Sequence, residues 1–312
     1  MVDVAAFYRF AATPLPGDVV VALVDSAHAV ASVRGVCGSI LIATEGVNGT
    51  IAGARDDVDA VLDVLRAQPG LEALRVQWST APSMPFHRLK VEKKREIVTF
   101  HQPAADPTKQ VGTYVTPEDW NAVVDDNDVV VIDARNDFEV ALGSFAGAVN
   151  PQTTTFTELA AWFDANLDPA RDTKVAMFCT GGIRCEKASS YLLDKGFKEV
   201  LHLDGGILGY LAKVPEADSR FSGECFVFDQ RVSLGHGLAQ GTAKVCHACY
   251  RAVDEATLQS PLYEEGVSCP ACHGQASAER LASRRERQRQ VQLAIKDGRK
   301  HIGDVMPRQP RR

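Results

Sequence analysis

An apolar run that ends in a cysteine constrains this chain more than any other feature. From Val175 to Ser189 the sequence reads VAMFCTGGIRCEKAS. The apolar residues predict a buried strand, the two glycines predict a tight loop, and the residues after Arg184 favour a helix. A strand, a loop and a helix in this order place one thiol among the backbone N–H groups of a helix N-terminus. Such a site favours the chemistry of anionic sulfur or phosphate.

The loop itself is short, with four residues between Cys179 and Arg184. The backbone N–H groups between these two residues can turn inward around whatever the sulfur carries, and we expect the field there to lower the thiol pKa from its usual value of about 8.5. Cys179 is therefore the predicted nucleophile. The alternative is a buried small hydrophobe, but such a cysteine needs neither the two glycines nor the arginine. The predicted anion cradle comprises Thr180, Gly181, Gly182, Ile183 and Arg184.

A second cysteine, Cys185, directly follows the arginine. It could resolve a persulfide or a sulfenate on Cys179 as a disulfide, or it could be an ordinary helix residue. The sequence leaves both interpretations open.

The cysteine loop resembles the active loop of the rhodanese (sulfurtransferase) family, whose loop of this length accommodates a cysteine persulfide. The related dual-specificity phosphatases have one more residue in the loop. Two flanking stretches, Val129–Glu139 and Val200–Tyr210, extend the resemblance over residues 113–214. It implies an α/β domain with a parallel sheet, in which Asp133 and Arg135 support the site.

Residues 1–102 predict a separate α+β domain. Strand patterns at 4–10, 38–44, 49–53 and 74–78 alternate with helical patterns at 17–34 and 55–68. The order β-α-β-β-α-β indicates a ferredoxin-like or acylphosphatase-like sandwich. The basic stretch 86–98 that follows is either a charged strand edge or a contact for an RNA backbone.

Two Cys-x-x-Cys pairs mark the cysteine-rich segment 215–278. Nineteen residues separate the pair Cys246 and Cys249 from the pair Cys269 and Cys272. This spacing is typical of a zinc ribbon, in which two turns bring four sulfurs to one tetrahedral ion. The sequence predicts a structural zinc ion here, and the alternative is a set of free cysteines or a dithiol pair.

The tail, residues 279–312, is strongly basic. It holds eleven Lys and Arg against four Asp and Glu, a charge of +7, and subtracting this from the chain's −6 leaves −13 for the rest. The tail is compatible with a helix, and its charge favours a polyanion such as nucleic acid, although a merely solvated helix is the alternative.

The composition limits the class of protein. The chain has 312 residues, 45% of them hydrophobic, and no apolar run of the roughly twenty residues that would span a bilayer. We therefore expect a soluble protein, and the first residues show no secretory signal. Eight cysteines, two Cys-x-x-Cys pairs among them, suggest metal and catalytic roles in a reducing cytoplasm.

No flavin or haem motif is present in the sequence. His202 and Asp204 fall within the rhodanese signature and are therefore poor candidates for an iron site.

Over residues 1–275 the order of parts resembles the rhodanese-related tRNA uridine hydroxylases. The matching residues are Thr44–Thr50, the Cys179 loop, Gly223–Val232 and the two cysteine pairs. The resemblance implies oxygen-dependent hydroxylation of the wobble uridine, tRNA position 34, to 5-hydroxyuridine. Cys179 would be required, molecular oxygen would be the co-substrate, and the anticodon loop of tRNA would be the partner, with no obligate protein partner inferred.

Two other functions stay open on the sequence. One is a persulfide or thiosulfate sulfurtransferase that delivers sulfur, for example to tRNA. The other is a non-catalytic adaptor that binds zinc and RNA. An intact Cys179 and Arg184 argue against the adaptor, whereas the hydroxylase and the sulfurtransferase would share every catalytic residue that can be recognised. A fold alone does not decide between them.

Overall fold

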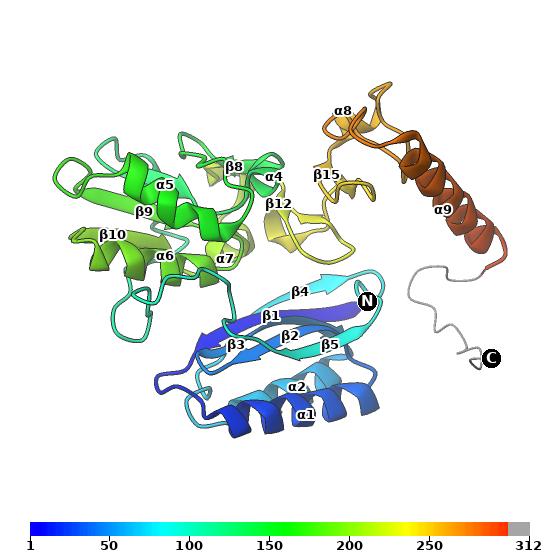
Figure 1. The fold of residues 1–312 in the computed structure, drawn as a ribbon. Coiled ribbons are helices and arrows are strands. Elements are labelled where there is room, and N and C mark those ends of the chain that lie inside the picture. Colours follow the sequence, from blue (N-terminus) through cyan, green and yellow to red (C-terminus); the bar gives the residue numbers. More distant parts are fainter. Residues whose placement is uncertain (299–312) are drawn as a thin grey trace. The chain divides into compact units, whose positions relative to one another are not determined.

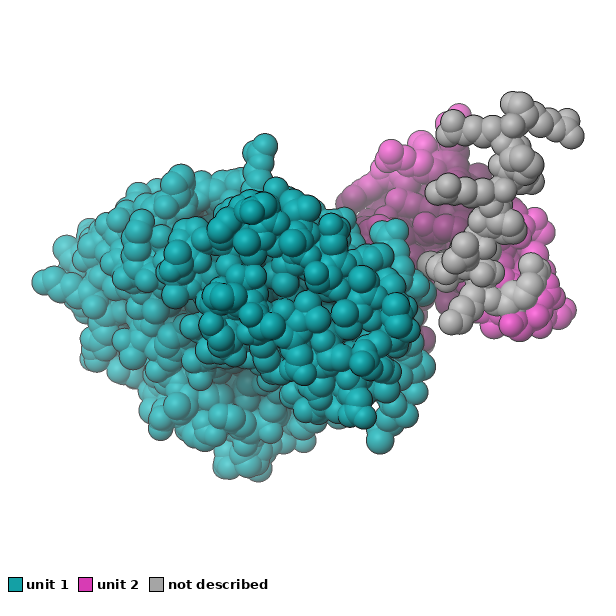
Figure 2. All heavy atoms as spheres, turned by 90° about the horizontal axis from the view of Figure 1, so that it is seen from below, with its two compact units in different colours: residues 1–241 teal, residues 242–312 magenta. Residues whose placement is uncertain are grey.

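The computed structural model describes residues 1–298. It divides into two compact units, Met1–Gly241 and Thr242–Arg312, which Figure 2 distinguishes by colour. Residues 299–312 of the predicted basic tail lie outside the described residues.

The first domain is a sheet covered on one face by two helices (Figure 1). The strand order is β4-β1-β3-β2-β5, with β5 parallel to β2 and the other neighbours antiparallel. This confirms the predicted ferredoxin-like fold, to which the basic stretch adds β5 as an edge strand. The elements are β1 (Val2–Phe10), α1 (Gly17–Val33), β2 (Cys37–Ala43), β3 (Gly46–Gly53), α2 (Arg55–Arg66), β4 (Arg75–Ala81) and β5 (Leu89–Lys93).

Alternation along β1 gives this sheet two different faces. Ala5 and Phe7 belong to the core beneath α1 and α2. Tyr8 and Phe10 point to the opposite face, where they pack with Ile183 of the second domain. The face of the first sheet that α1 and α2 do not cover, here called its open face, therefore packs against the cysteine loop.

The second domain is a parallel α/β layer structure, as predicted for a rhodanese domain. Its sheet has the order β6-β10-β9-β7 with all neighbours parallel, and an apolar core lies on each face. The elements are β6 (Thr113–Val115), α3 (Trp120–Val124), β7 (Val130–Asp133), α4 (Asp137–Val140), β8 (Gly143–Phe145), the 3₁₀ turn Phe156–Glu158, α5 (Leu159–Asn166), β9 (Lys174–Phe178), α6 (Ile183–Asp194), β10 (Glu199–Leu203) and α7 (Gly206–Lys213).

The residues after α7 remain part of the first unit. Strand β11 pairs with β8, and Phe221, Cys225 and Leu234 are buried in the core of the rhodanese-like domain. The compact unit consequently ends at Gly241, whereas the sequence grouped residues 215–241 with the cysteine-rich segment. The elements are the 3₁₀ turn Glu216–Asp218, β11 (Phe221–Gly223), β12 (Cys225–Phe226), β13 (Ser233–Leu234) and the 3₁₀ turn His236–Leu238.

The second unit is built around four cysteines and the long helix α9 (Ala278–Lys296). Its core consists of Cys246, Cys269, Cys272 and Val253. Its elements are β14 (Lys244–Val245), β15 (Ala252–Val253), α8 (Glu255–Leu258) and α9 (Ala278–Lys296). Ser277 caps α9 by accepting a hydrogen bond from the backbone N–H of Arg280. Through residue 298, no helix is both long and apolar enough to cross a membrane.

Candidate functional site

Cys179 lies directly after β9, at the point where the chain turns into α6. The backbone N–H of Gly182 donates to Cys179 Sγ at 3.2 Å, and Gly182 adopts a φ of +100°, which glycine tolerates best. Two N–H groups of α7 hold the other side of the loop, those of Ile207 and Leu208, which donate to the carbonyls of Cys179 and Thr180 at 2.9 Å and 3.0 Å. Two carbonyls of the loop thus accept hydrogen bonds from α7.

The pKa of Cys179 is lowered to about 6. Burial, the largest influence, opposes the thiolate, but a hydrogen bond from the Cys185 thiol, the positive charge of Arg184 and the Gly182 N–H outweigh it. The pKa of Cys185 is raised well above its usual value, mainly by burial and then by Cys179, so Cys185 keeps its proton and can donate it. Cys179 is therefore the thiolate of the pair, and it accepts a hydrogen bond from the Cys185 thiol.

Arg184 closes the loop by binding the carboxylate of Glu139, a role that no local sequence pattern indicates. Its two terminal nitrogens donate to Glu139 at 2.7 Å and 2.8 Å, and one also donates to the Thr180 hydroxyl at 3.1 Å. Glu139 comes from α4, and its side chain is fully buried. The guanidinium therefore fixes the loop and still contributes its charge to the sulfur.

Asp133 and Arg135 form a second buried pair beneath Glu139. Arg135 donates to both carboxylate oxygens of Asp133 at 2.8 Å and 2.7 Å, and both side chains are fully buried. Arg135 also donates to the carbonyl of Gly143 at 2.6 Å, and Ser144 donates to Asp133 at 2.7 Å. This arrangement anchors the segment between β7 and β8, which is consistent with the supporting role that the sequence predicts.

A cavity of about 760 Å³ adjoins Cys179 within the first unit. Ala6, Tyr8 and Gln77 of the first sheet line one side of it, Cys179 and Gly181 line another, and Phe228 lies in its wall. The volume falls in the range of small-molecule sites. Cys179 lines this cavity but has no exposed surface, so neighbouring atoms cover its sulfur.

The first domain supplies side chains that local sequence patterns could not identify. Tyr8 donates to Glu186 in α6 at 2.8 Å, and Arg75 of β4 forms an ion pair with Asp204 after β10. The alternation of β1 could have shown that Tyr8 faces away from the helices. Nothing in the sequence placed that face against the cysteine loop.

His202 and Asp204 do not form an iron site. His202 is buried, its Nε2 lies 3.1 Å from the carbonyl oxygen of Gly112, and its pKa is lowered to about 4, chiefly by burial. It is a neutral core histidine. In the part of the chain that the structure describes, the four cysteines are the one group of potential metal ligands that converges.

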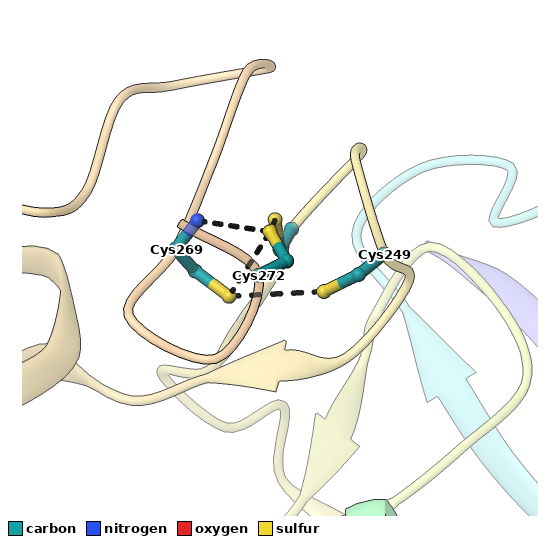
Figure 3. Close-up of side chains that lie close together, drawn as sticks. Cys249, Cys269 and Cys272 are labelled. Atoms are coloured by element: carbon teal, nitrogen blue, oxygen red, sulfur yellow. Dashed lines mark hydrogen bonds between the residues drawn. The ribbon is translucent and has the colours of Figure 1, made fainter. Parts of the chain in front are cut away.

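The cysteine pairs come together as predicted, and their sulfur atoms all lie within 4.8 Å of one another. Figure 3 shows Cys249, Cys269 and Cys272 pointing toward a common centre. The separations are 3.9 Å for Cys246 to Cys272, 3.7 Å for Cys249 to Cys269 and 3.8 Å for Cys269 to Cys272. Four thiolates at about 2.3 Å from a tetrahedral zinc ion would be about 3.8 Å apart. The four sulfurs therefore fit a metal ion of that geometry.

Some cations of the basic stretch 86–98 and of α9 bind groups within the protein itself. Glu92 of β5 pairs with Lys90 in the same strand at 3.2 Å and with Lys94, just after the strand, at 2.8 Å, which favours the interpretation as a charged strand edge. On α9, Arg284 donates to the carbonyls of Val267 and Ala248, both at 3.2 Å. Part of the basic helix thus holds the cysteine turns.

Comparison with known families agrees with this architecture. Residues 2–97 match a UPF0176 acylphosphatase like domain, and residues 116–213 match a rhodanese-like domain. The fold and the cysteine loop thus define the class: proteins that join an acylphosphatase-like domain to a rhodanese-like domain.

Full-length relatives narrow this class to one family. The chain is 48% identical to a tRNA uridine(34) hydroxylase of Teredinibacter turnerae and 50% identical to one of Agrobacterium fabrum, over 96% of this chain and 92% and 94% of theirs. The chain belongs to the tRNA uridine(34) hydroxylase family. Among solved structures, a rhodanese-like domain protein from Staphylococcus aureus is 20% identical with a TM-score of 0.27, covering 31% of this chain and 90% of that one.

Proposed function

We propose that this protein hydroxylates C5 of uridine 34 in tRNA, with molecular oxygen as co-substrate and Cys179 as the essential nucleophile. One observation carries the proposal: relatives named for this activity align with 96% of the chain at 48–50% identity. The net reaction incorporates one oxygen atom of O₂ into the base and reduces the other to water, with two electrons from a reductant. Because tRNA is the substrate, we place the protein in the cytoplasm.

The cavity beside Cys179 suits a single nucleotide base. A wobble base lies in a single-stranded loop, so it can leave its stack without breaking a base pair. The exposed fraction of Phe228 is 67%, and its ring lies in the cavity wall. This aromatic face is our candidate for stacking on the base.

The thiolate supplies the chemistry that an unactivated uracil ring lacks. Addition of sulfur at C6 moves the electrons of the C5–C6 double bond toward C5 and the O4 carbonyl, which makes C5 reactive toward oxygen. Since Cys179 is fully buried, contact with the base requires either a movement of the cavity wall or a persulfide whose outer sulfur projects into the cavity.

The second unit is assigned to tRNA binding, with a structural zinc ion at its centre. The four sulfurs have the number, identity and separation that zinc prefers. When bound, zinc would hold Cys246, Cys249, Cys269 and Cys272 together and order the turns that contact α9. Arg280, Arg289 and Lys296 of α9 are further cations for phosphate groups.

The test uses purified protein with undermodified tRNA, oxygen and a reductant. Nucleoside mass spectrometry should detect 5-hydroxyuridine with the parent protein and at least about a hundredfold less with Cys179→Ser. Cys37→Ser is the matched control, because Cys37 lies on β2 and does not line the cavity. Undiminished hydroxylation by Cys179→Ser would refute the role of the cysteine, and no hydroxylation by the parent would refute the activity.

A sulfurtransferase is the second candidate, favoured by the thiolate and the Gly182 N–H that faces its sulfur. It predicts transfer of sulfur from thiosulfate to cyanide, or a thiolated nucleoside in tRNA. Appearance of a thiolated nucleoside in place of 5-hydroxyuridine would favour this function over the hydroxylase.

A further inference from the structure

The hydroxyl of Tyr8 reaches from the first domain into the cysteine site. It donates to Oε1 of Glu186, and the Tyr114 hydroxyl donates to the same oxygen, both at 2.8 Å. Glu186 lies in the first turn of α6 and is 8% exposed. One buried carboxylate oxygen thus accepts two phenol protons, one from each domain.

Tyr8 stands directly over the cysteine loop. A methyl group added to Gly182 would lie 2.9 Å from the Tyr8 hydroxyl oxygen, and the N–H of Gly182 is the donor to Cys179 Sγ. Tyr8 and Cys179 line the same cavity, whereas Tyr114 does not. A base that reacts with Cys179 would therefore lie within reach of the Tyr8 hydroxyl.

The surrounding charges favour a proton acceptor behind Tyr8. Burial raises the pKa of Glu186, while its hydrogen bonds from the two tyrosines and the charges of Arg75 and Arg9 oppose that rise. Burial, followed by Glu186, raises the pKa of Tyr8 well above its usual value. Tyr8 thus remains a phenol, and Glu186 is a stronger base than an ordinary glutamate.

We propose that Tyr8 and Glu186 form a proton relay that removes the C5 hydrogen of the target uridine in the step that expels Cys179. The C5–H bond breaks and its electrons form the C5–C6 double bond. The C6–S bond breaks and its electrons leave on the sulfur as thiolate. The C5 proton passes to the Tyr8 oxygen while the Tyr8 proton passes to Glu186, so the step involves no net oxidation or reduction.

This inference rests on the proposed hydroxylation and on addition of Cys179 at C6. It assigns a catalytic role to a residue outside the rhodanese-like domain, and so explains why the open face of the first sheet meets the cysteine loop. A general base of this kind contributes about 10² to 10⁴ in rate.

The decisive variant is Tyr8→Phe, which keeps the ring and removes the proton carrier. We expect 5-hydroxyuridine formation to fall about a hundredfold while a covalent complex of protein and tRNA accumulates, visible by denaturing electrophoresis and absent when Cys179 is also replaced by Ser. Glu186→Gln should give the same complex and serves if Tyr8→Phe folds poorly. The matched control is Tyr191→Phe. The hydroxyl of Tyr191, in the second domain, likewise donates to a carboxylate, that of Asp164 at 2.8 Å, but Tyr191 does not line the cavity.

The outcomes separate the inference from the function on which it rests. A parent protein that makes no 5-hydroxyuridine refutes the function. An active parent with a Tyr8→Phe variant of near-parent rate refutes the relay. A slow variant without the covalent complex also refutes it, because loss of positioning alone would slow addition as much as elimination.

Discussion

Glu139 accepts two hydrogen bonds from the guanidinium of Arg184, at 2.7 Å and 2.8 Å, and its side chain is fully buried. Arg184 of the cysteine loop is therefore paired with a carboxylate of its own domain. Burial alone would raise the pKa of Glu139, but Arg184 outweighs it and leaves the pKa below its usual value. Both side chains are largely buried, so solvent screens their attraction less than it screens a surface pair.

Replacing Glu139 with Gln should destabilise the protein, because Arg184 would keep its charge and lose its charged partner. Loss of one member of a buried ion pair costs about 3 kcal/mol or more. Urea unfolding of the first unit would measure the loss. The matched control is Glu118→Gln, since Glu118 pairs with Lys213 on the surface, where both side chains are more than half exposed, and no measurable change is expected there. Equal effects from the two substitutions would contradict this account.

The same pair predicts how stability depends on pH. The folded-state pKa of Glu139 is lowered, so its contribution is complete above the ordinary glutamate pKa of about 4.3 and is lost as the pH falls through the folded value. We expect the stability of the parent to decline more steeply below pH of about 4 than that of Glu139→Gln. Urea unfolding at a series of pH values measures this dependence. If the free energy of unfolding falls equally steeply with decreasing pH in the parent and in Glu139→Gln, Glu139 does not contribute.

Ionisation of Cys179 should be visible near pH 6, because its pKa is lowered to about 6. The thiol predominates below that pH and the thiolate above it. The ultraviolet absorbance of the thiolate, taken as the difference between the parent and Cys179→Ser, follows this without requiring a reagent to reach the buried sulfur. Cys185→Ala removes a donor and should move the midpoint to higher pH, while Cys185→Ser keeps a donor and should restore much of the shift. If the pH midpoint of the Cys179 ionisation is the same in both variants as in the parent, Cys185 is not the donor.

The sequence predicted the features that depend on neighbours in the chain. The periodicity of residues 55–68 gave α2, whose Val58, Val61, Leu62 and Leu65 are buried, and the spacing of the cysteine pairs gave the sulfur cluster. The loop between Cys179 and Arg184 was recognisable for the same reason, since its length and its glycines are local properties.

The features that depend on distant pairs could not be predicted. Tyr8 and Glu186 are 178 positions apart, and their contact exists because two separately folded domains bury particular faces against each other. Glu139 lay within a recognised stretch, but its partnership with Arg184 depends on how α4 packs against the loop. Nor could composition show that Arg284 of the basic tail is bound to backbone carbonyls of the cysteine turns.

Removing the metal should unfold the second unit and leave the first intact. The core of this unit consists largely of cysteines, so most of its folding free energy would come from the metal. We expect one zinc ion per chain, and chelation should abolish hydrogen-exchange protection in residues 242–298 with little change in residues 1–241. Cys269→Ser should behave like the chelated protein and Cys37→Ser like the parent. A second unit that stays protected without metal would contradict the proposed zinc site.

Phe228 should contribute to tRNA affinity and not to stability. Its ring contacts Phe226 edge to face at a centroid distance of 5.1 Å, is 67% exposed and lies in the cavity wall. Stacking of a base on an aromatic ring contributes about 1–3 kcal/mol, so Phe228→Ala should weaken binding of an anticodon stem-loop by about fivefold or more. Phe228→Tyr keeps an aromatic face and should retain binding. Val33→Ala is the control, because Val33 is an exposed apolar residue at the end of α1 that does not line the cavity. If fluorescence titration gives the same dissociation constant for Phe228→Ala, Phe228→Tyr and Val33→Ala, the base does not stack on Phe228.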